Sequence, residues 1–554
     1  MRQIPTVKPI DQPGMRTILR TGSIQYHPIL FAIFPVLSLY GANAAQLRFQ
    51  RIFPVLLAAI AFAIVVWLVA LYLTKDMLKG SAAASIIIIL SFSFGHVIQS
   101  ATWLLASTGM ISSWIGLVRG QFSDVIWIAA YVVGGATVMW LLWRSKGLAG
   151  PINKGLTFIS LVVVLTAVGQ IAIGEITKPR TSVGNFVKQW NAGLLTEPIS
   201  ATKSSAATLP DIYYIVPDSF GSSKAFSEYL DYDNSEFINS LEEKGFYVAD
   251  ESNANYAWTE LSLTSSLNLD YLDILPETIG EETSDTLPLE VMADRNRLFE
   301  FLKSRGYLIN VFADEYELTD IGSAENYITP QGWVVDAFQN LFLNTTPVPA
   351  VLRLLSLTPA YDFHREHALF MFDRLSEFES GSRPQFILAH FMVPHPPFVF
   401  GPNGERVGED QSIYFDGGLV LITGETRADY IEGYVGQTEY VSDRLEQVVE
   451  EILTDRDRPV IIVIQGDHGP ASLMHPLSLE ETDVRERMPI LNAYYFSDGD
   501  YSDLYEDISP VNTFRLILNQ YLGTELALLP DKHYFTVLNL PYRFIDITDK
   551  LSAE

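Results

Sequence analysis

Apolar segments long enough to cross a membrane dominate the first third of the chain. They cover five stretches, at about residues 28–45, 52–74, 82–105, 123–143 and 155–175. Each is close to the roughly 20 residues that an α-helix needs to span the hydrocarbon core of a bilayer. Five in succession argue against a signal peptide and against the buried helices of a soluble core. Residues 1–176 are therefore predicted to form a multi-pass transmembrane domain of about five helices.

The charges between these segments set the expected orientation. Basic residues gather before the first segment and in the second and fourth loops: Arg2, Lys8, Arg16, Arg20, Lys75, Lys79, Arg144, Lys146 and Lys154. The first and third loops carry only Arg48, Arg51 and Arg119. Because basic loops stay in the cytoplasm, the N-terminus is expected there. An odd number of spans then delivers the remainder of the chain to the extracellular or periplasmic side of the cell membrane.

That remainder is strongly acidic. Residues 1–209 carry 16 Lys and Arg against 5 Asp and Glu, while the whole chain has a formal charge of −28, so residues 210–554 hold −39. An acidic surface excludes nucleic acid as the expected partner, because its binding requires basic patches. The chain has no cysteine, which excludes disulfides, thiolate metal ligands and a thiol nucleophile. Residues 210–554 are long enough to bury a full core without such cross-links.

Residues 177–209 are predicted to be a juxtamembrane linker between the two parts. Its apolar side chains are Phe186, Val187, Trp190, Leu194 and Leu195. They fit one short amphipathic turn at the membrane interface, and a plain polar linker fits the segment equally well.

Beyond Pro210, short apolar strands alternate with helical stretches, which predicts an α/β fold with a central, mostly parallel sheet. Three nearly continuous apolar runs stand out: "DIYYIV" (211–216), "QFILAHFMV" (385–393) and "PVIIVIQ" (459–465). Such runs are typical of strands covered by helices on both faces. Each is followed by polar side chains, namely Asp218, His395, Asp467 and His468. Because ligands bind at the carboxyl ends of parallel strands, these residues are expected to meet at one edge.

This group has the chemistry of a metal site. Carboxylates and neutral imidazoles are ordinary ligands of Zn²⁺ and Mn²⁺, so Asp218, Asp467 and His468 would supply three positions. Thr259, at the expected start of a helix, is the candidate for the fourth. A metal ion and a helix N-terminus both favour the alkoxide of a threonine, which is otherwise a poor nucleophile. The alternative is that Thr259 only caps the helix.

The order of these motifs resembles the alkaline phosphatase/sulfatase superfamily. The matching elements are Asp218 after the first strand, Thr259 opening a helix, Pro394-His-Pro-Pro-Phe398, and Asp467-His-Gly469. The spacing of Thr259, Ser262 and Ser265 is similar to the sulfatase nucleophile motif. Five spans before an external domain resemble most closely the membrane-bound lipoteichoic acid synthase-like branch. The resemblance covers about residues 208–545 and implies an alkaline-phosphatase-like sandwich, with 210–554 as the catalytic domain.

The resemblance also implies roles for individual residues. Asp218, Asp467, His468 and Thr259 become metal ligands, and Thr259 becomes the nucleophile that forms a covalent enzyme intermediate. His395 falls where the family places a histidine that contacts the transferred group. One departure is Asp218, because the synthases place a glutamate there.

The expected cofactor is one divalent ion, Mn²⁺ or Zn²⁺, with Mg²⁺ as a further option. A second metal is not favoured, since no Asp-x-x-x-His pair is found, although His390, His475 or His533 would be available to it. His390 and Arg365 are weaker candidates for contacting the substrate. His364 and His367, which flank Arg365, are expected on a solvated helix face.

Together these features predict a membrane-anchored, metal-dependent phosphoryl transferase. Its donor would be a phosphodiester in a lipid head group, and its acceptor a glycan, polyol or lipid, as in phosphoglycerol or phosphoethanolamine transfer. Phosphate esters are favoured over sulfate esters because no cysteine can mature into formylglycine. A phosphatase, phosphodiesterase or sulfatase with the same site is one alternative, and a catalytically silent binding module is another. The oligomeric state is left open.

Overall fold

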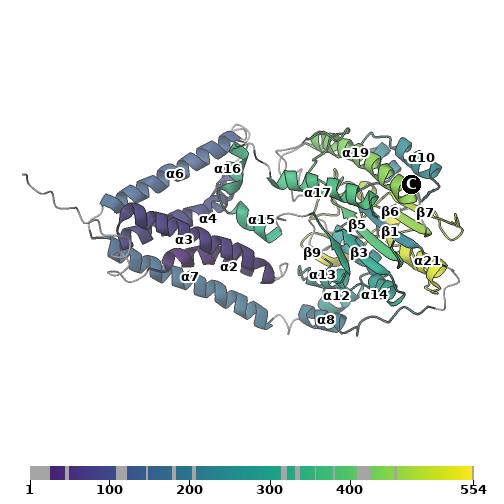
Figure 1. Cartoon of the computed structure of the whole chain (residues 1–554), viewed down its shortest axis with the longest axis horizontal. Coiled ribbons are helices and arrows are strands. Elements are labelled where there is room, and N and C mark those ends of the chain that lie inside the picture. The colour runs from purple at the N-terminus through teal and green to yellow at the C-terminus, as the bar shows by residue number, and fades with distance from the viewer. Residues whose placement is uncertain are drawn as a thin grey trace, which may run out of the picture. The chain divides into compact units, whose positions relative to one another are not determined.

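The computed structural model describes most of the chain as two compact units. The described residues are 25–43, 49–107, 121–144, 147–177, 182–201, 208–312, 321–330, 337–355, 357, 359–378, 381–407, 426–454 and 458–551. The first unit, called here the helical unit, comprises residues 1–177 and 335–357. The second, called the sheet unit, comprises residues 178–334 and 358–554 (Figure 1). The sequence predicts residues 335–357 inside the second domain, whereas the structure groups them with the first.

The helical unit is built from long apolar helices. They are α2 (His27–Ala42), α3 (Ile52–Thr74), α4 (Met77–Ser107), α6 (Gln121–Arg144) and α7 (Ala149–Thr177), with a short 3₁₀ turn, η1 (Phe49–Arg51), before α3. Four of these regions are long and apolar enough to cross a membrane: Phe49–Thr74, Met77–Ile98, Asp124–Leu141 and Ala149–Gly174. The first predicted span corresponds to α2, which is apolar but only 16 residues long. The helical unit therefore contains four of the five predicted membrane-crossing helices at full length.

A seven-stranded mixed sheet forms the centre of the sheet unit. Its strands, in spatial order, are β2 (Tyr247–Val248), β7 (Asn492–Phe496), β6 (Val460–Gln465), β1 (Asp211–Pro217), β5 (Gln385–Phe391), β3 (Leu308–Phe312) and β4 (Asn326–Ile328). The five strands from β6 to β4 are parallel, and β7 is antiparallel to both of its neighbours. A separate antiparallel pair is formed by β8 (Tyr534–Val537) and β9 (Leu540–Asp546). The prediction of an α/β fold with a mostly parallel central sheet is confirmed.

Helices cover both faces of this sheet. They are α8 (Ser182–Asn191), α9 (Ser223–Tyr229), α10 (Ser235–Glu243), α11 (Thr259–Asn268), α12 (Ile274–Ile279), α13 (Leu287–Asp294), α14 (Arg297–Ser304), α17 (Pro359–Ser376), α19 (Arg427–Leu453), α20 (Val484–Arg487), α21 (Pro510–Leu522) and α22 (Thr548–Leu551). Alternate residues of β1 enter two different cores: Tyr214 packs with α11 and α21 residues, and Tyr213 packs with α17 and α19 residues. Because both faces are covered, every residue of β1 is buried.

Two local predictions are wrong for the same physical reason, which is packing that the sequence does not reveal. The apolar side chains of α8 do not form a free amphipathic turn, because Phe186 and Trp190 are buried in the core of the sheet unit and the Trp190 indole donates to the Arg295 carbonyl. His364 and His367 of α17 are buried rather than solvated.

Helix α19 supports the loop that follows β5. Gln437 is fully buried, and its Oε1 accepts hydrogen bonds from the backbone N–H groups of Val399, at 2.7 Å, and Phe400, at 3.2 Å. Its Nε2 donates to the carbonyls of Pro394 and His395, at 3.2 and 3.1 Å. One side chain therefore satisfies four polar backbone groups of a buried loop.

Replacing this side chain should destabilise the sheet unit. Gln437→Leu keeps the volume but leaves several buried backbone groups without partners, which should lower the free energy of unfolding by about 2–4 kcal/mol. The measurement is chemical denaturation of the purified protein, with Gln520→Leu, at a partly exposed position, as the matched control. Equal effects of the two substitutions would contradict this role of Gln437.

Candidate metal centre

The site lies at the carboxyl edge of the three central strands. In the sheet, β1 is flanked by β6 and β5, and all three run parallel. Asp218 follows β1, Asp467 and His468 follow β6, and His390 is the penultimate residue of β5. The Asp218 N–H donates to the Phe391 carbonyl at 2.8 Å, which fixes the end of β1 beside the end of β5. Parallel strand order therefore brings together residues that lie about 250 positions apart in the sequence.

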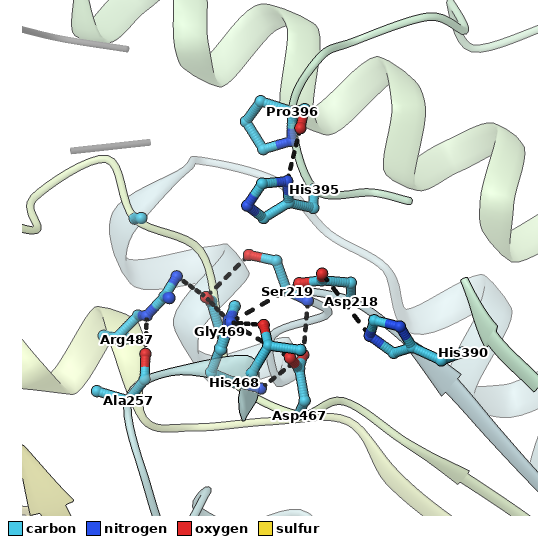
Figure 2. Close-up of polar contacts among 12 residues, drawn as sticks. Asp218, Ser219, Ala257, His390, His395, Pro396, Asp467, His468, Gly469 and Arg487 are labelled. Carbon is cyan, nitrogen blue, oxygen red and sulfur yellow. Dashed lines mark hydrogen bonds and ion pairs between the residues drawn. The ribbon is translucent and has the colours of Figure 1, made fainter. Parts of the chain in front are cut away.

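Three of the four residues that the sequence predicts as metal ligands lie within 4 Å of the fourth, His468. His468 Nε2 is 3.0 Å from Thr259 Oγ1, 3.3 Å from Asp467 Oδ2 and 3.7 Å from Asp218 Oδ1. On the other side of Asp218, its Oδ2 is 3.7 Å from His390 Nε2 (Figure 2). One ligand atom each from Asp218, His390 and Asp467 lie within 4.8 Å of one another. His390, predicted as a substrate contact, thus lies among the candidate ligands.

These separations suit the ligands of a divalent ion. Two ligands bound at about 2.0–2.2 Å in tetrahedral geometry are roughly 3.3–3.6 Å apart, close to the distances between these donor atoms. All five side chains are nearly or fully buried, with Thr259 the most exposed at 8%. Two buried carboxylates side by side repel each other and are costly to desolvate unless positive charge compensates them. The donor set therefore fits a divalent metal ion.

The hydrogen bonds of His468 define which ring nitrogen faces the site. Its Nδ1 lies 3.2 Å from the Gly469 carbonyl, which can only accept, so Nδ1 carries the proton. In the neutral ring Nε2 then presents a lone pair toward Thr259 and the carboxylates. Burial opposes the charge of Asp467, but the positive charge that His468 and His390 carry when protonated, together with the Ser219 N–H, outweighs burial and holds the pKa of that carboxyl below its ordinary value. The carboxylate and the imidazole lone pair are the forms that bind metal.

Thr259 occupies the first position of α11. The residue before it, Trp258, has extended backbone angles and takes the N-cap position, so the Thr259 side chain is not required for capping. Its hydroxyl lies 3.0 Å from Nε2 of His468. The unpaired N–H groups and the dipole at a helix start favour negative charge at this position. Every residue of α11 except Glu260 is buried, which anchors the helix start in the core.

Ser219 ties the loop after β1 to the loop after β6. Its backbone adopts a left-handed conformation with φ of 68°, which is uncommon for a residue with a side chain. In this conformation its N–H donates to Asp467 Oδ1 at 2.9 Å and its hydroxyl donates to the Gly469 carbonyl at 3.0 Å. Such local strain persists where the surrounding structure holds it and is common at functional sites.

Arg487 links the loop that precedes Thr259 to the loop that contains His468. Its guanidinium donates from Nε to the Ala257 carbonyl at 2.9 Å and from Nη1 to the Gly469 carbonyl at 3.0 Å (Figure 2). The same group lies over the Trp258 ring, 5.8 Å from its centre, and the side chain is fully buried. These contacts of Arg487 to both loops depend on tertiary packing, which no local sequence motif predicts.

The remaining candidates lie in different surroundings. His395 is half-buried, and its Nδ1 donates to the Pro396 carbonyl at 2.6 Å, while Figure 2 shows the ring above Ser219 and Asp218. Arg365 donates to the carbonyls of Val399 and Gly404 and lies over the Phe400 ring, so these contacts brace a loop. His475 pairs with Glu481 at 3.8 Å. His533 Nδ1 lies 2.9 Å from the Ala254 carbonyl. Among the described residues, neither of these two histidines belongs to the metal-ligand group.

The fold and the cluster together define an α/β enzyme with a carboxylate–imidazole centre at the carboxyl edge of its sheet. A family model described as Sulfatase matches residues 210–514, which is more than half of the chain. The chain therefore belongs to the sulfatase family, and it is a transferase or hydrolase of that superfamily. The predicted membership of the alkaline phosphatase/sulfatase superfamily is confirmed.

Several solved structures are similar to the chain at low sequence identity. The C-terminal periplasmic domain of EcEptC from Escherichia coli, in complex with Zn, is 13% identical, with 63% of this chain and 96% of that chain covered and a TM-score of 0.41. The integral membrane protein lipooligosaccharide phosphoethanolamine transferase A from Neisseria meningitidis is 11% identical, with 89% and 95% covered and a TM-score of 0.38. BT1596, a 2-O GAG sulfatase, is 13% identical, with 60% and 73% covered and a TM-score of 0.36. No curated protein matches the chain.

Removing His390 should weaken metal binding. His390→Gln keeps a polar side chain but removes an imidazole from the cluster, so the affinity for Zn²⁺ or Mn²⁺ should fall roughly 10-fold or more. Isothermal titration of metal-depleted protein measures this change. His475→Gln is the matched control, because that histidine lies outside the cluster. A His390 variant that binds metal as tightly as the control would remove His390 from the ligand set.

Substituting Arg487 should disturb the alignment of the two loops. Arg487→Lys keeps the charge but cannot donate in a fixed fork to two carbonyls, so metal affinity and activity should both fall. The guanidinium also lies over Trp258, so the indole fluorescence should change with metal in the native protein and change less in the variant. Arg485→Lys, at a largely exposed neighbouring position, is the control. Unchanged metal affinity and activity in Arg487→Lys would show that its role is confined to stability.

Proposed function

We propose that this chain is a membrane-anchored, metal-dependent phosphoryl transferase that uses Thr259 as its nucleophile. The observation that carries the proposal is the contact between Thr259 Oγ1 and His468 Nε2, 3.0 Å apart within a buried carboxylate–imidazole cluster. A hydroxyl at a helix start, beside ligands for a divalent ion, has the surroundings that an activated threonine requires. Asp218, Asp467, His468 and Thr259 would hold one ion, Zn²⁺ or Mn²⁺, and His390 is a further ligand candidate.

The first step would form a covalent phosphothreonine. A bond would form between phosphorus and Oγ1 of the Thr259 alkoxide, whose proton has already passed to solvent, and the bond from phosphorus to the departing alcohol oxygen would break. The divalent ion, when bound, supplies positive charge that favours the Thr259 alkoxide and the charged phosphoryl oxygens. His395, in its doubly protonated imidazolium form, would give its Nε2 proton to the departing oxygen, since its Nδ1 proton is committed to the Pro396 carbonyl.

The second step would return the enzyme to its starting state. An acceptor hydroxyl attacks the phosphorus, the bond to Thr259 breaks, and the acceptor proton passes to Nε2 of His395. Water in the role of acceptor would make the enzyme a hydrolase, and an alcohol would make it a transferase. The same residues serve both outcomes, so the acceptor decides the class of reaction.

The nature of the nucleophile favours phosphate over sulfate esters. Sulfatases that depend on formylglycine make it from cysteine or serine, and this chain has no cysteine. Ser262, the nearest serine in the motif, lies one turn further into buried α11, whereas Thr259 contacts His468. Threonine retains its hydroxyl, which is suited to forming a phosphate ester directly.

The helical unit favours a lipid donor. Four helices in the described part of the chain are suited to crossing a membrane, which supports an enzyme held at the bilayer. Given the expected orientation, the site would face the extracellular or periplasmic space, where a lipid head group such as phosphoglycerol or phosphoethanolamine is locally concentrated. The acceptor would be a glycan, a polyol or another lipid.

The decisive experiment compares Thr259→Ala with Thr259→Ser in full-length protein reconstituted with head-group-labelled phosphatidylglycerol or phosphatidylethanolamine. Loss of the nucleophile should reduce release of diacylglycerol by at least about 10³-fold, while serine should retain part of the activity. Intact mass spectrometry should find the head-group phosphate on the native protein and none on the alanine variant. Diacylglycerol release that persists in Thr259→Ala would refute the proposal.

The same assay separates the alternatives. Label that appears on an added polyol or glycan identifies a transferase, and label released as free head-group phosphate identifies a hydrolase. Turnover of an aryl sulfate but of no phosphodiester would assign a sulfatase. Metal binding without turnover of any ester would support a catalytically silent module.

A further inference from the structure

The chain leaves the sheet unit once and returns to the helical unit between β4 and α17. Residues 335–357 belong to the helical unit, although the residues on both sides belong to the sheet unit. They form two short helices, α15 (Ala337–Asn344) and α16 (Val348–Leu354), which lie beside the long helices α2, α4 and α6 in Figure 1. We call residues 337–357 the returning hairpin.

Close packing attaches the first helix of the hairpin to the long helices. Phe338 and Phe342 are buried in the core of the helical unit, and the Phe342 ring centre lies 5.2 Å from that of Phe92 in α4. The Gly95 N–H donates to the Thr345 carbonyl at 3.0 Å. A Cβ atom on Gly95 would lie 1.9 Å from the Asn344 carbonyl oxygen, so only glycine permits this approach. The glycine that interrupts the third apolar segment is therefore a docking position for the hairpin.

A bidentate ion pair attaches the second helix. Arg353 Nε lies 2.8 Å from Asp124 Oδ2, and its Nη2 lies 2.9 Å from Asp124 Oδ1, at the start of α6. Arg353 is the only charged residue in "AFQNLFLNTTPVPAVLRLLSL" (337–357), which lies within a region of net charge −39. Because Asp124 neutralises it, the hairpin presents no net charge of its own, unlike the acidic sequence on either side.

The outward side of the hairpin is apolar. Its large exposed residues are Leu341 (42%), Val348 (41%), Val351 (40%), Leu355 (62%) and Leu357 (51%). In the described part of the sheet unit, by contrast, only six large apolar side chains are exposed, and they are dispersed along the sequence: Leu194, Tyr327, Leu477, Leu528, Leu538 and Ile545. Concentrated apolar exposure of this kind marks a surface that contacts something other than water.

The neighbouring surface indicates what that contact is. Helix α16 packs against α6, whose own exposed residues near Asp124 include Val125 and Ile126. These belong to the candidate span Asp124–Leu141, whose side chains are largely exposed and face lipid if the helix crosses a membrane. Three of the exposed apolar residues of the hairpin, Val348, Val351 and Leu355, belong to α16 or directly follow it, and α16 is the helix that packs against α6. If a partner protein in water covered the hairpin instead, contact with lipid would have to stop between α6 and the adjacent helix α16.

We propose that the returning hairpin is an interfacial membrane element whose apolar side, Leu341, Val348, Val351, Leu355 and Leu357, contacts lipid acyl chains. Helices of eight and seven residues are only about 12 and 10 Å long, too short to cross a bilayer, so they lie in its surface layer. The partner is a lipid surface rather than a protein. This inference depends on the membrane assignment and not on the proposed reaction.

The hairpin gives the sheet unit a second attachment to the membrane. The chain passes between the two units near residue 177, near residue 335 and again near residue 357. Anchoring at more than one point restricts the space that the sheet unit can explore and raises the effective concentration of membrane-bound groups around it. A lipid substrate would benefit from this restriction whatever its head group is.

The absence of cysteine makes a direct test straightforward. Val351→Cys and Leu355→Cys each introduce a single thiol into the full-length protein, to be labelled with an environment-sensitive fluorophore. The labelled protein is reconstituted into vesicles of phosphatidylcholine and phosphatidylglycerol. Doxyl groups near the lipid head groups should reduce the fluorescence roughly twofold, and doxyl groups at the ends of the acyl chains should reduce it less.

Two matched leucine positions calibrate the result. Leu165→Cys, exposed on α7 within a candidate span, should be quenched most strongly by the deep doxyl groups. Leu477→Cys, exposed on the sheet unit, should not be quenched. The proposal is overturned if labels at Val351 and Leu355 behave like the label at Leu477. A blue-shifted emission without doxyl quenching would also overturn it and would indicate a protein partner, such as a second copy of the chain.

Discussion

Two carboxylates buried side by side are the constraint on which the site depends. Asp218 and Asp467 end adjacent parallel strands and are each 2% exposed. Their mutual repulsion and their loss of hydration oppose folding, because an interior offers little dielectric screening. Imidazoles from His390 and His468 lie on opposite sides of Asp218, and a divalent ion would compensate the remaining charge. Stability and metal binding are therefore coupled in this arrangement.

The surroundings of the cluster hold its loops in place through hydrogen bonds. Ser219, in its strained conformation, joins the loops after β1 and β6 through two hydrogen bonds. The Tyr434 hydroxyl of α19 donates to the Ser219 carbonyl, and the Tyr430 hydroxyl accepts from the Ala471 N–H. Arg487 joins the Thr259 side to the His468 side. Such preorganisation allows charges to be stabilised during reaction without rearrangement of the protein.

The sequence predicts the parts of this structure that strong local patterns encode. Continuous apolar runs that end in Asp or His predict both the parallel strands and the convergence of Asp218, Asp467 and His468, since parallel order forces the strand ends together. His390 is harder to assign, because a strand buried on both faces carries no alternation that reveals which way a side chain points. The apolar stripe of α8 would pack equally well against lipid or against a protein core, so its sequence does not distinguish the two environments. The returning hairpin depends on contacts with Phe92, Gly95 and Asp124, more than 200 residues earlier, which no local pattern records.

In the proposed function, chemistry and substrate choice belong to different units of the molecule. The carboxyl edge of the sheet would determine what bond can be attacked, because it holds the candidate ligands, the proposed nucleophile and the helix start behind it. It would not select the leaving group, since a phosphodiester of any alcohol presents similar oxygens to Thr259. That selection falls to whatever holds the substrate near the site, and a helical unit suited to a bilayer favours substrates that share it. A sulfatase fold that belongs to a membrane protein can thus acquire lipid specificity through its anchor while its catalytic residues stay the same.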